Sequence, residues 1–571
     1  MSWKLVTELK NTLAREKGYY LYAAGARRRM ALAYPNSYRV GMSNLGFHII
    51  YDIMNRRMDT ACERFFLPER ASRAEHLRTN TPLMSLETQT FLSDFPLIGF
   101  DISFEMDYFN ILDMLSLGKV KVKAAERGDG DPIVIAGGPC ATFNPEPLSP
   151  FIDAFIIGEG EETMMRFMDA FYAAQDEGVG RRELLMRLAH VDGVYVPSLY
   201  DVSYHDDGTI KSIEPKDGAP SSIKRQWVKN LDEYPAHTIV VTDDAEFDMY
   251  LIETARGCGR HCRFCMAGYC YRRPRNRSLD VLRAELRDAK KYHKRIGLMG
   301  AAISDYPEID DLCRSITGED MTMSVASFRA DSVTETLVES LVGSGMKTLT
   351  LAPEAGSARM RAVINKGIEE EHLFHTMDLG MAAGIRRYRL YIMIGLPYET
   401  ENDILAVADL ARRLKDYVGK NGMLTLSVNP FIPKPFTPFQ WLPMEQKKTI
   451  EHDFKLLKSG LKGEKGVEIL MEPIRSSYIQ GVLARGDRRV GEALYAAHVS
   501  GGAKSFRRTM KERGLDPSFY LYREREDDEI FPWEMLDMLV TRKYLFNELV
   551  KAKKGEATIK CFDNCHRCGV C

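Results

Sequence analysis

Residues 253–278 read ETARGCGRHCRFCMAGYCYRRPRNRS, with three cysteines in a C-x3-C-x2-C spacing. These cysteines are Cys258, Cys262 and Cys265, and an aromatic residue, Phe264, precedes the last of them. Three thiolates this close together can each bind one iron of a [4Fe-4S] cluster, which normally has four cysteine ligands. The spacing therefore predicts a cluster in which one iron lacks a protein ligand.

A structural zinc site is the alternative interpretation of the same three cysteines. Zinc prefers four tetrahedral ligands, and His261 or Cys270 could supply the fourth. The flanking residues favour the cluster, because Met249–Glu253 has the pattern of a buried strand and residues 279–293 have that of a helix. A loop between a strand and a helix is where (β/α) barrels carry their chemistry.

The composition is typical of a soluble globular protein. The 571 residues are 45% hydrophobic and 28% charged, with a formal net charge of −2. The length predicts several domains, and the near-neutral charge gives no whole-chain argument for nucleic-acid binding. No apolar run reaches the roughly 18 residues of a membrane span. The N-terminal residues are charged and lack the apolar core of a signal peptide, so we expect a cytoplasmic protein.

Residues 1–165 alternate between strand and helix patterns. Such alternation predicts a Rossmann-like, doubly wound parallel sheet that binds ligands at the carboxyl ends of its strands. The expected strands are residues 30–34, 97–103, 132–136 and 155–157. Glycines after the last two would let the backbone approach a ligand. The candidate cofactor-binding residues there are Gly137, Gly138, Thr142, Gly158 and Glu159.

Residues 246–445 show a more regular alternation of the same kind. Six βα units in succession predict a partial barrel with its mouth at the carboxyl ends of the strands. The expected strands are residues 249–253, 295–299, 322–328, 347–352, 389–394 and 424–428. Residues 166–245, between the two regions, are expected to form a connector with a hairpin that turns at Asp-Asp-Gly.

Residues 446–571 are expected to be largely helical and to end in a second cysteine motif. The expected helices are residues 447–461, 476–497 and 531–551. The charged run 485–489 is expected to form ion pairs at a helix end, and contacts to the mouth of the barrel are the alternative. The motif consists of Cys561, Cys565, Cys568 and Cys571, and its first three members repeat the C-x3-C-x2-C spacing. An auxiliary [4Fe-4S] cluster and structural zinc are both expected from such a motif, and free thiols are the remaining alternative. Seven of the eleven cysteines lie in the two motifs, a distribution typical of metal binding in a reducing compartment.

Several of these motifs together resemble the radical S-adenosylmethionine (radical SAM) superfamily. The cysteine triplet with its aromatic residue resembles the superfamily signature, and the order of strands resembles its (β/α)6 barrel. PEAGSARMRAVINKG (353–367) and YIMIGLPYET (391–400) resemble later strand-end motifs, and VNPFIPKPFTPFQW (428–441) looks like a segment of a subgroup near the methylthiotransferases. The resemblance implies that SAM chelates the open iron. An electron from a donor such as flavodoxin or ferredoxin then cleaves SAM to methionine and a 5′-deoxyadenosyl radical.

The resemblance also implies which residues contact SAM. Gly300 and Ala301 stand where the family often has Gly-Gly-Glu, so the contact with the amino group is expected from their backbone alone or from elsewhere in the chain. The side chains of Ser327 and Arg329 are placed to meet the carboxylate. The remaining implied contacts are those of Phe264 beside the cluster, of Glu354 and Ser357 with the ribose or amino group, and of the Ile394 and Gly395 backbone with adenine. A helix N-cap and a plain buried strand are the alternatives for the last two motifs.

The first region resembles the cobalamin-binding-type domain that precedes many radical SAM domains. The matching pieces are YPNSYRVGMSNLGFH, AGGPCATFNPEP and IIGEGEE. The D-x-H-x-x-G motif that supplies a histidine to cobalt is missing, and His48 does not lie in that frame. Cobalamin without a protein histidine on cobalt is therefore one expectation, and a domain that kept the fold and lost the cofactor is the other.

Cobalamin-dependent methylation of a carbon atom in an unidentified substrate is the function we expect. An RNA-modifying, methylthiotransferase-like enzyme is one alternative, in which the basic run 272–277 would bind RNA. The same arginines could instead pair with local carboxylates or with SAM. A non-catalytic protein with zinc in both motifs is the other alternative.

Overall fold

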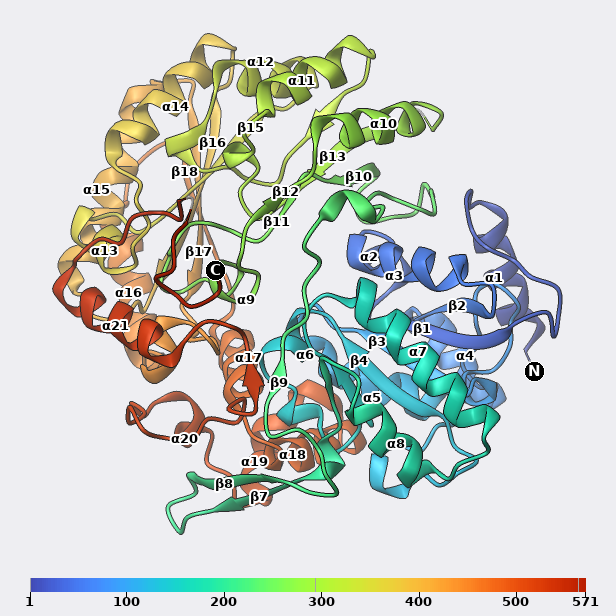
Figure 1. The fold of residues 1–571 in the computed structure, drawn as a ribbon. Coiled ribbons are helices and arrows are strands. Elements are labelled where there is room, and N and C mark those ends of the chain that lie inside the picture. Colours follow the sequence, from blue (N-terminus) through green and yellow to red (C-terminus); the bar gives the residue numbers. More distant parts are fainter. Residues whose placement is uncertain (1, 293, 563) are drawn as a thin grey trace. The chain divides into compact units, whose positions relative to one another are not determined.

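The computed structural model describes residues 2–292, 294–562 and 564–571, which form two compact units (Figure 1). Unit 1 contains the residues up to Asp248 together with Val482–Pro517 and Asp528–Leu539. Unit 2 contains the described residues of Met249–Gly481, Ser518–Asp527 and Val540–Cys571. The expected C-terminal helical region, 446–571, is therefore divided between the two units. His293, at the end of one expected helix, lies outside the described residues.

Unit 1 is built on a sheet with the strand order β2-β1-β3-β4-β5-β6. Neighbouring strands are parallel from β2 to β5, and β6 is antiparallel to β5. This order is doubly wound, with a topological switch point between β1 and β3, as the sequence predicts. The strands are β1 Arg28–Tyr34, β2 Thr60–Phe66, β3 Leu97–Asp101, β4 Ile133–Gly137, β5 Ala154–Ile156 and β6 Val194–Tyr195.

Strand β2 was not predicted, because charged residues interrupt its apolar pattern. Its sequence, TACERFF, is buried over its first six residues. Arg64 within it is 1% exposed and pairs with Glu16 at 2.6 Å and with Glu87 at 2.6 Å. Burial of a charge is tolerated when it is paired and hydrogen-bonded, so this strand occupies the sheet edge despite its composition.

Helices pack around this sheet, including two from late in the chain. Phe506 of α19 meets Phe109 of α5 edge to face, with ring centroids 5.5 Å apart. His498 of α18 bonds Ser116 and Asp113 of α5, each at 2.8 Å. The helices of unit 1 are α1 Trp3–Ala14, α2 Tyr38–Gly41, α3 Leu45–Arg56, α4 Arg70–Thr79, α5 Tyr108–Leu117, α6 Pro139–Phe143, α7 Gly160–Asp176, α8 Arg181–Ala189, α18 Arg489–Val499 and α19 Phe506–Glu512.

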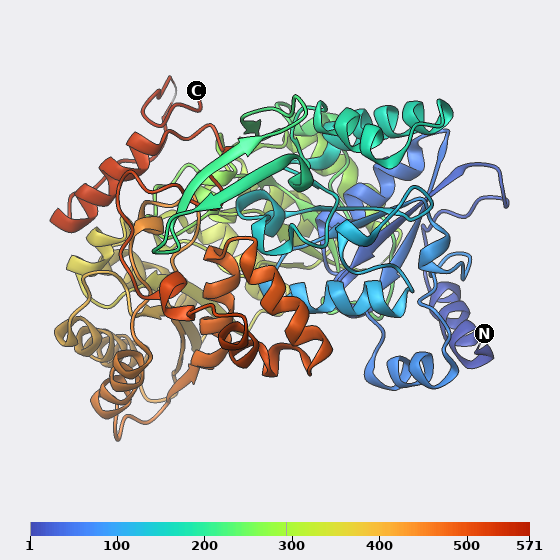
Figure 2. The same ribbon diagram turned by 90° about the horizontal axis from the view of Figure 1, so that it is seen from below.

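The expected connector, 166–245, is part of unit 1. The predicted hairpin is present as the antiparallel pair β7 Tyr200–Tyr204 and β8 Ile210–Pro215, drawn in green in Figure 2. Strand β9, Ile223–Lys224, pairs with β19, Leu536–Asp537. The latter strand lies where the sequence predicts a helix over 531–551, and the helix begins only at Arg542, after its N-cap Thr541.

Unit 2 carries two sets of parallel strands, β10-β13-β14 and β15-β16-β17-β18. An isolated parallel bridge between Phe328 and Leu351 links the two sets. Helices α10, α11, α12, α14 and α15 follow one another along the outside of these strands (Figure 1). The strands are β10 Met249–Glu253, β13 Arg295–Met299, β14 Met323–Ser324, β15 Thr348–Glu354, β16 Arg387–Ile394, β17 Met423–Pro430 and β18 Val467–Met471.

Two strands of unit 2 differ from the prediction. The third, expected over 322–328, is reduced to Met323–Ser324. Strand β18 was assigned to the helical region, yet it pairs with β17 along its whole length. Its alternating burial follows from this pairing, and only the tertiary structure supplies the partner.

The helices of unit 2 separate its strands, as expected for βα units. They are α9 Ala267–Cys270, α10 Leu279–Lys290, α11 Ile309–Gly318, α12 Glu335–Gly343, α13 Ala358–Val363, α14 Glu370–Ala382, α15 Glu401–Val418, α16 Lys447–Gly460 and α21 Arg542–Lys554. Helices α17 Ile474–Arg485 and α20 Pro517–Leu521 each begin in one unit and end in the other. The expected single helix over 476–497 is thus two, α17 and α18, interrupted at residues 486–488.

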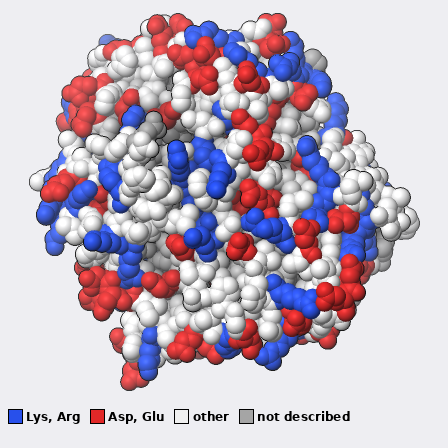
Figure 3. Space-filling view, in the orientation of Figure 1, with Lys and Arg blue, Asp and Glu red and all other residues white. Residues whose placement is uncertain are grey.

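Charges of both signs are interspersed on the face drawn in Figure 3, where blue and red side chains alternate. This distribution agrees with the formal net charge of −2. Over residues 2–292, 294–562 and 564–571, none of the helices combines the length and the apolar character that a bilayer crossing requires.

Candidate functional site

The cysteine triplet lies in a loop that follows β10, as predicted. We call residues 257–274 the cluster loop. A short antiparallel ribbon, β11 Ala255–Arg256 with β12 Arg275–Asn276, closes the base of this loop. Gly257 has φ +83°, and a Cβ there would lie 2.0 Å from the Tyr271 carbonyl oxygen. The close approach of the two ends therefore requires glycine at this position.

The three cysteines of the triplet form no disulfide; Cys262 is buried, and Cys258 and Cys265 are half-buried. The backbone N–H of Arg260 donates to Cys258 Sγ at 3.4 Å, and Arg329 Nη1 lies 3.8 Å from Cys262 Sγ. Burial and the two neighbouring thiols raise the pKa of Cys265 to about 11. In the part of the chain that the structure describes, no group of three or more His, Cys, Asp or Glu side chains lies closely enough together to hold a single metal ion.

His261, the alternative zinc ligand, is turned toward other groups. Its Nδ1 lies 2.5 Å from the Tyr544 hydroxyl, and its Nε2 lies 3.5 Å from Cys561 Sγ. Burial, with the nearby positive charges of Arg272 and Arg567, lowers the pKa of His261 to about 3, so the ring is neutral. With both ring nitrogens directed at other groups, His261 is not placed to complete a zinc site with the triplet.

Ion pairs of Arg260, which lies between the first two cysteines of the triplet, join the cluster loop to the ends of neighbouring strands. Arg260 pairs with Asp305, which follows β13, and with Asp331, which follows β14, both at 2.7 Å. Asp331 also pairs with Arg329 at 3.0 Å, the residue whose guanidinium faces Cys262. A chain of charged groups thus runs from the loop through two strand ends and back to a cluster thiol.

Helix α21 and the residues after it contact Arg263, which lies between the last two cysteines of the triplet. Arg263 pairs with Glu548 of α21 at 3.2 Å, and both side chains are fully buried. Arg263 also donates to the carbonyl oxygens of Ala362, Val363 and Glu556. These contacts join the loop to two later segments of unit 2, one of them nearly three hundred residues along the chain. No local pattern in the sequence predicts them.

A cavity of about 400 Å³ opens beside the cluster loop at the carboxyl ends of β15, β16 and β17. Glu354 at the end of β15 has φ +66°, and its carboxylate pairs with Lys366 at 3.0 Å. Burial disfavours the ammonium of Lys366, but Glu354 and the Cys262 thiol offset this and raise the pKa of Lys366. The cavity is lined by Phe264, Met266, Glu354, Tyr391, Met393, Asn429, Pro430, Phe431, Ile432 and Lys434.

Among the predicted SAM-binding residues, Phe264 and Glu354 line this cavity. Gly300 and Ala301 are exposed after β13, and Ser327 is half-buried. Arg329 is held by Asp331 and by the Lys366 carbonyl oxygen, at 3.0 and 2.6 Å. Its predicted contact with the SAM carboxylate stays a prediction, whereas its contact with Cys262 was not foreseen.

The other two predicted contacts are already engaged within the chain. Ser357 is the N-cap of α13, where it accepts from the Met360 N–H and donates to Asp403 at 2.6 Å. Phe431 N–H donates to the Ile394 carbonyl oxygen, and Gly395 N–H donates to Glu399 at 2.6 Å. The alternatives of a helix N-cap and a buried strand thus describe these positions as the structure has them.

Sequence reasoning missed Lys366, Arg260 and Glu399. Lys366 lies within PEAGSARMRAVINKG, the motif that contains Glu354. Lys366 follows the short helix α13, and a short helix after a strand brings the next residues back toward the end of that strand. Its position near Glu354 could therefore have been predicted. Arg260 lies between two cluster cysteines, but its partners follow different strands and no local pattern identifies them.

The basic run after the cluster loop is mostly buried. Arg272 and Arg277 are each 1% exposed, and Arg277 pairs with Glu253 at 2.9 Å. This pairing agrees with the interpretation that these arginines meet local carboxylates. The run 485–489 likewise forms ion pairs, with Arg488 on Glu146 at 2.8 Å and Arg489 on Asp487 at 2.6 Å.

In unit 1, the chain itself covers part of the predicted cofactor-binding residues at the carboxyl ends of the strands. The Thr142 hydroxyl donates to Gly138 O and accepts from Gly158 N–H. Gly158 has φ +105°, and a Cβ there would lie 2.2 Å from the Gln226 carbonyl oxygen. Glu159 accepts from the Val228 N–H at 2.9 Å. Residues 226–228, which we call the strap, therefore occupy the space beside Gly158 and Glu159 where a ligand was expected.

The histidine of this region is also engaged. His48 is 1% exposed, its Nε2 lies 3.0 Å from the Met42 carbonyl oxygen, and its Nδ1 accepts from the Val240 N–H at 3.4 Å. It is therefore not presented to cobalt, as its position outside the D-x-H-x-x-G frame predicts.

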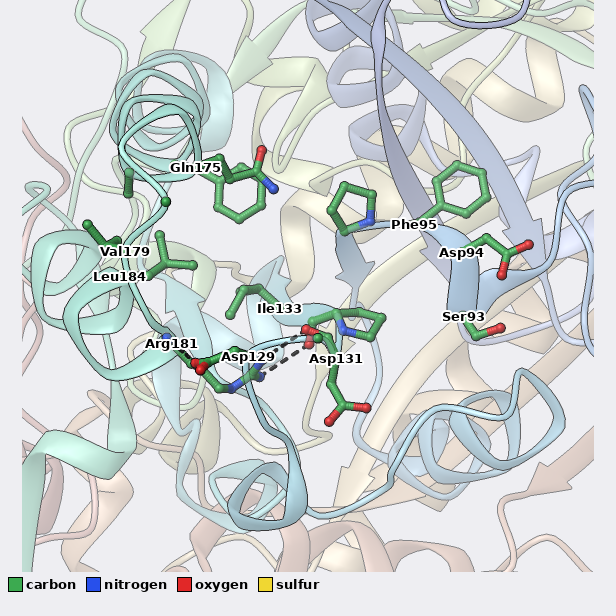
Figure 4. Close-up of a pocket in the computed structure, with 16 residues that line it drawn as sticks. Ser93, Asp94, Phe95, Asp129, Asp131, Ile133, Gln175, Val179, Arg181 and Leu184 are labelled. Atoms are coloured by element: carbon green, nitrogen blue, oxygen red, sulfur yellow. Dashed lines mark hydrogen bonds between the residues drawn. The ribbon is translucent and has the colours of Figure 1, made fainter.

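A cavity of about 440 Å³ in unit 1 lies at the amino ends of the strands (Figure 4). It is lined by residues just before β3 and β4, among them Asp94, Phe95 and Asp131, and by residues of α7, α8 and the turn between them. Arg181 spans it and bonds Asp129 through its backbone N–H at 2.6 Å. Doubly wound sheets bind ligands at the carboxyl ends of their strands, so this cavity is at the edge where the fold does not place a cofactor.

Residues 252–411 match the family model of the radical SAM superfamily. Residues 46–197 match the model described as the N-terminal part of radical SAM proteins. These ranges contain the cluster loop and most of the sheet of unit 1.

Two relatives and one solved structure are also similar to the chain. The uncharacterized protein MJ0966 of Methanocaldococcus jannaschii is 30% identical over 473 residues, 82% of this chain and 90% of that protein. The uncharacterized methyltransferase PH0819 of Pyrococcus horikoshii is 24% identical over 308 residues, 51% of this chain and 60% of that protein. The cobalamin-dependent S-adenosylmethionine radical enzyme OxsB with aqua-cobalamin bound has a TM-score of 0.47 and 14% identity, over 82% of this chain and 63% of that chain. That likeness is too low to transfer features of OxsB to this protein.

Proposed function

The chain belongs to the radical SAM superfamily, and we propose that it is an enzyme that cleaves SAM reductively at Cys258, Cys262 and Cys265 to methylate a carbon atom of its substrate. The observation that carries the first part is the cluster loop, with three free thiols at the carboxyl end of β10 and an ion-pair frame around them. A bound [4Fe-4S] cluster and SAM, given one electron by a donor such as flavodoxin or ferredoxin, supply a 5′-deoxyadenosyl radical.

Residues of the chain would position the cluster and SAM and exclude water from the site. The guanidinium of Arg329 lies 3.8 Å from Cys262 Sγ, where its charge would complement a thiolate bound to iron. Glu354 lines the cavity beside the loop and pairs with Lys366, and such a pair matches the amino and carboxylate groups of SAM. The apolar side chains of Phe264, Met266 and Phe431 along the same cavity exclude water from a reactive radical.

Methyl transfer is proposed on the doubly wound sheet of unit 1 and on the name of the relative PH0819. We propose that unit 1 binds a cobalamin as the methyl carrier. Its residues fit in part. Gly137 at the end of β4 leaves open space that the cofactor could approach, whereas Asp101 and Ile102 pack against Gly138 and the strap covers Gly158 and Glu159. Since His48 is engaged, it would not supply an imidazole to cobalt.

Anaerobic purification with iron and cobalamin supplied tests both parts. The first part requires 5′-deoxyadenosine and methionine after addition of SAM and dithionite, and their loss in the Cys258→Ala, Cys262→Ala and Cys265→Ala variants. The second requires about one cobalt per chain and a labelled methyl group in the product. A colourless protein with zinc at the triplet would overturn the whole proposal. SAM cleavage without cobalt would leave a radical enzyme and overturn the methyl carrier.

An RNA substrate is a weaker candidate, because the run that would bind it is largely buried. Only Arg273 and Asn276 of residues 272–277 are exposed. A salt-dependent RNA affinity that is lost on removing exposed charges of unit 2 would support this alternative.

A further inference from the structure

We propose that the C-terminal motif holds a second iron–sulfur cluster and that His261, from the loop of the first cluster, donates a hydrogen bond to its Cys561 thiolate. The two centres would then share one structural element. This inference goes beyond methyl transfer, and its only link to the proposed function is that Cys258, Cys262 and Cys265 bind the first cluster.

The C-terminal motif is attached to the cluster loop through the backbone. The N–H of Cys561 donates to the Gly259 carbonyl oxygen at 2.8 Å. The Cys568 carbonyl oxygen accepts from the N–H of Thr541, the N-cap of α21, at 3.0 Å. Asn365 bridges the same two segments, because its Nδ2 donates to the His261 and Thr558 carbonyl oxygens, each at 3.0 Å. The motif is thus anchored at both ends rather than left as a loose terminus.

His261 is aimed at this motif from inside the cluster loop. His261 is 2% exposed, and its Nε2 lies 3.5 Å from Cys561 Sγ. The Tyr544 hydroxyl lies 2.5 Å from Nδ1 on the other side of the ring. A metal-bound thiolate has no proton and can only accept. Nε2–H must therefore donate to Cys561, and the Tyr544 hydroxyl then donates to Nδ1, which fixes the tautomer.

The neighbouring thiols have cationic donors of their own. Cys565 Sγ accepts from Arg567 Nε at 3.1 Å. The buried guanidinium of Arg272 interacts electrostatically with Cys561 and Cys568. Cys565 and Cys568 are 5% and 3% exposed, whereas Cys571 is exposed. Cys561 is half-buried, and the sulfur atoms of Cys561 and Cys565 each have a hydrogen-bonding partner. Iron–sulfur clusters use such bonds to their thiolates, because these bonds tune the potential.

Iron–sulfur is favoured over zinc by the spacing of the cysteines. Cys561, Cys565 and Cys568 repeat the C-x3-C-x2-C spacing of Cys258, Cys262 and Cys265, the triplet proposed to bind the first cluster.

A variant without the first cluster isolates the second one. In the full chain with Cys258→Ala, Cys262→Ala and Cys265→Ala, we expect about four irons and matching sulfide to remain, with an electron paramagnetic resonance (EPR) signal after reduction. Adding Cys561→Ala and Cys565→Ala to this variant should remove the iron and the signal.

His261 is then tested within the same background by two substitutions. His261→Gln places an amide N–H near the position of Nε2, and we expect it to keep the signal and midpoint potential. His261→Leu removes the donor, so the more negative reduced state loses stabilisation and the midpoint potential should fall. Tyr544→Phe should produce a smaller fall, because it releases the tautomer but keeps the ring. Far-ultraviolet circular dichroism confirms that each variant is folded.

The wild-type chain provides a second route if the cysteine variants fail to fold. SAM binds the open iron of the first cluster, so the EPR signal that SAM does not change reports the second. That signal should respond to His261→Leu and not to His261→Gln.

Stoichiometric zinc, or no metal, at the C-terminal motif would overturn the second cluster. Equal potentials for His261→Leu and the unsubstituted chain would overturn the hydrogen bond. Loss of SAM cleavage with an intact second signal would instead refute the proposed function and leave this inference standing.

Discussion

The ammonium of Lys366 lies 3.0 Å from the carboxylate of Glu354, which lines the cavity beside the cluster loop. Both side chains are largely buried, at 7% and 14% exposure. Lys366 also interacts electrostatically with Cys262, so its charge lies near both Glu354 and a cysteine of the triplet. Lys366→Met removes the positive charge beside Glu354. We therefore expect this substitution to weaken binding of the SAM carboxylate at the cavity.

The predicted result for Lys366→Met is a 10- to 100-fold weaker SAM affinity, which corresponds to a charge-assisted hydrogen bond of about 1.5–3 kcal/mol. Equilibrium dialysis against cluster-loaded protein measures it. Lys366→Arg keeps the charge and should lose much less. An unchanged affinity in Lys366→Met would show that the pair serves only the fold.

Arg260 is predicted to retain the cluster through its pairs with Asp305 and Asp331. Arg260→Met removes both pairs and frees the loop segment between Cys258 and Cys262. We expect lower iron content after reconstitution and faster loss of the cluster absorption to a chelator. Arg314→Met is the matched control, because its pair with Asp311 is exposed and such pairs contribute little. Equal iron retention in both variants would argue against the ion-pair frame.

Glu548 is predicted to be essential to the stability of unit 2. Glu548→Gln leaves the guanidinium of Arg263 buried without its charged partner. Breaking a buried pair in this way costs about 3–5 kcal/mol. Urea unfolding of the metal-free chain, followed by hydrogen exchange in α21, measures the loss. Lys554→Gln on the same helix disrupts only an exposed pair with Glu556 and should leave the midpoint unchanged.

Much of the cluster site follows from local sequence, and its supports do not. Strands β10 and β13 have the predicted bounds, since their apolar runs end at glycine or at the cysteine loop. The strand-end position of Cys258, Cys262 and Cys265 follows from this pattern. Arg263 and Glu548, by contrast, are 285 residues apart, and each alone reads as a solvated charge. Only the folded chain identifies them as a buried pair.

The same limit explains the errors in unit 1. The glycines at 137–138 and 158 were expected to make room for a ligand, which is one of two reasons for glycine at a strand end. The other reason is close approach by the chain itself, and at Gly158 that is the case, with Gln226 O as the neighbour. A strap from 68 residues later has no local signature, so the sequence could not distinguish these two causes.

Glu399 is predicted to make stability depend on pH. Burial raises its pKa to about 8, although the N–H groups of Gly395 and Leu396 donate to it. Because the pKa is raised in the folded state, the folded chain holds a proton that the unfolded chain releases near pH 4.5. Stability should therefore fall as pH rises from about 5 to 8, by about 1.4 kcal/mol per pH unit for this group.

Glu399→Gln tests this dependence, because the amide oxygen can accept the same two bonds and does not ionise. Denaturation midpoints of the two proteins, measured between pH 5 and 9, should lie close together at pH 5, separate progressively up to about pH 8 with the variant more stable, and keep a constant difference above that pH. Parallel curves over the whole range would show that Glu399 stays ionised when folded.

The last prediction concerns the strap at the carboxyl edge of the unit 1 sheet. Gly158→Ala would place a Cβ 2.2 Å from the Gln226 carbonyl oxygen at φ +105°, so the strap must move. We expect more than about 3 kcal/mol of destabilisation in the cobalamin-free chain. Gly178→Ala, at φ +67° in open space, should cost about 1 kcal/mol. Thermal unfolding without cobalamin separates the two possible roles of Gly158. Normal stability combined with lost cobalamin binding would mean that the glycine faces the cofactor, because strain against the strap acts whether or not a ligand is present.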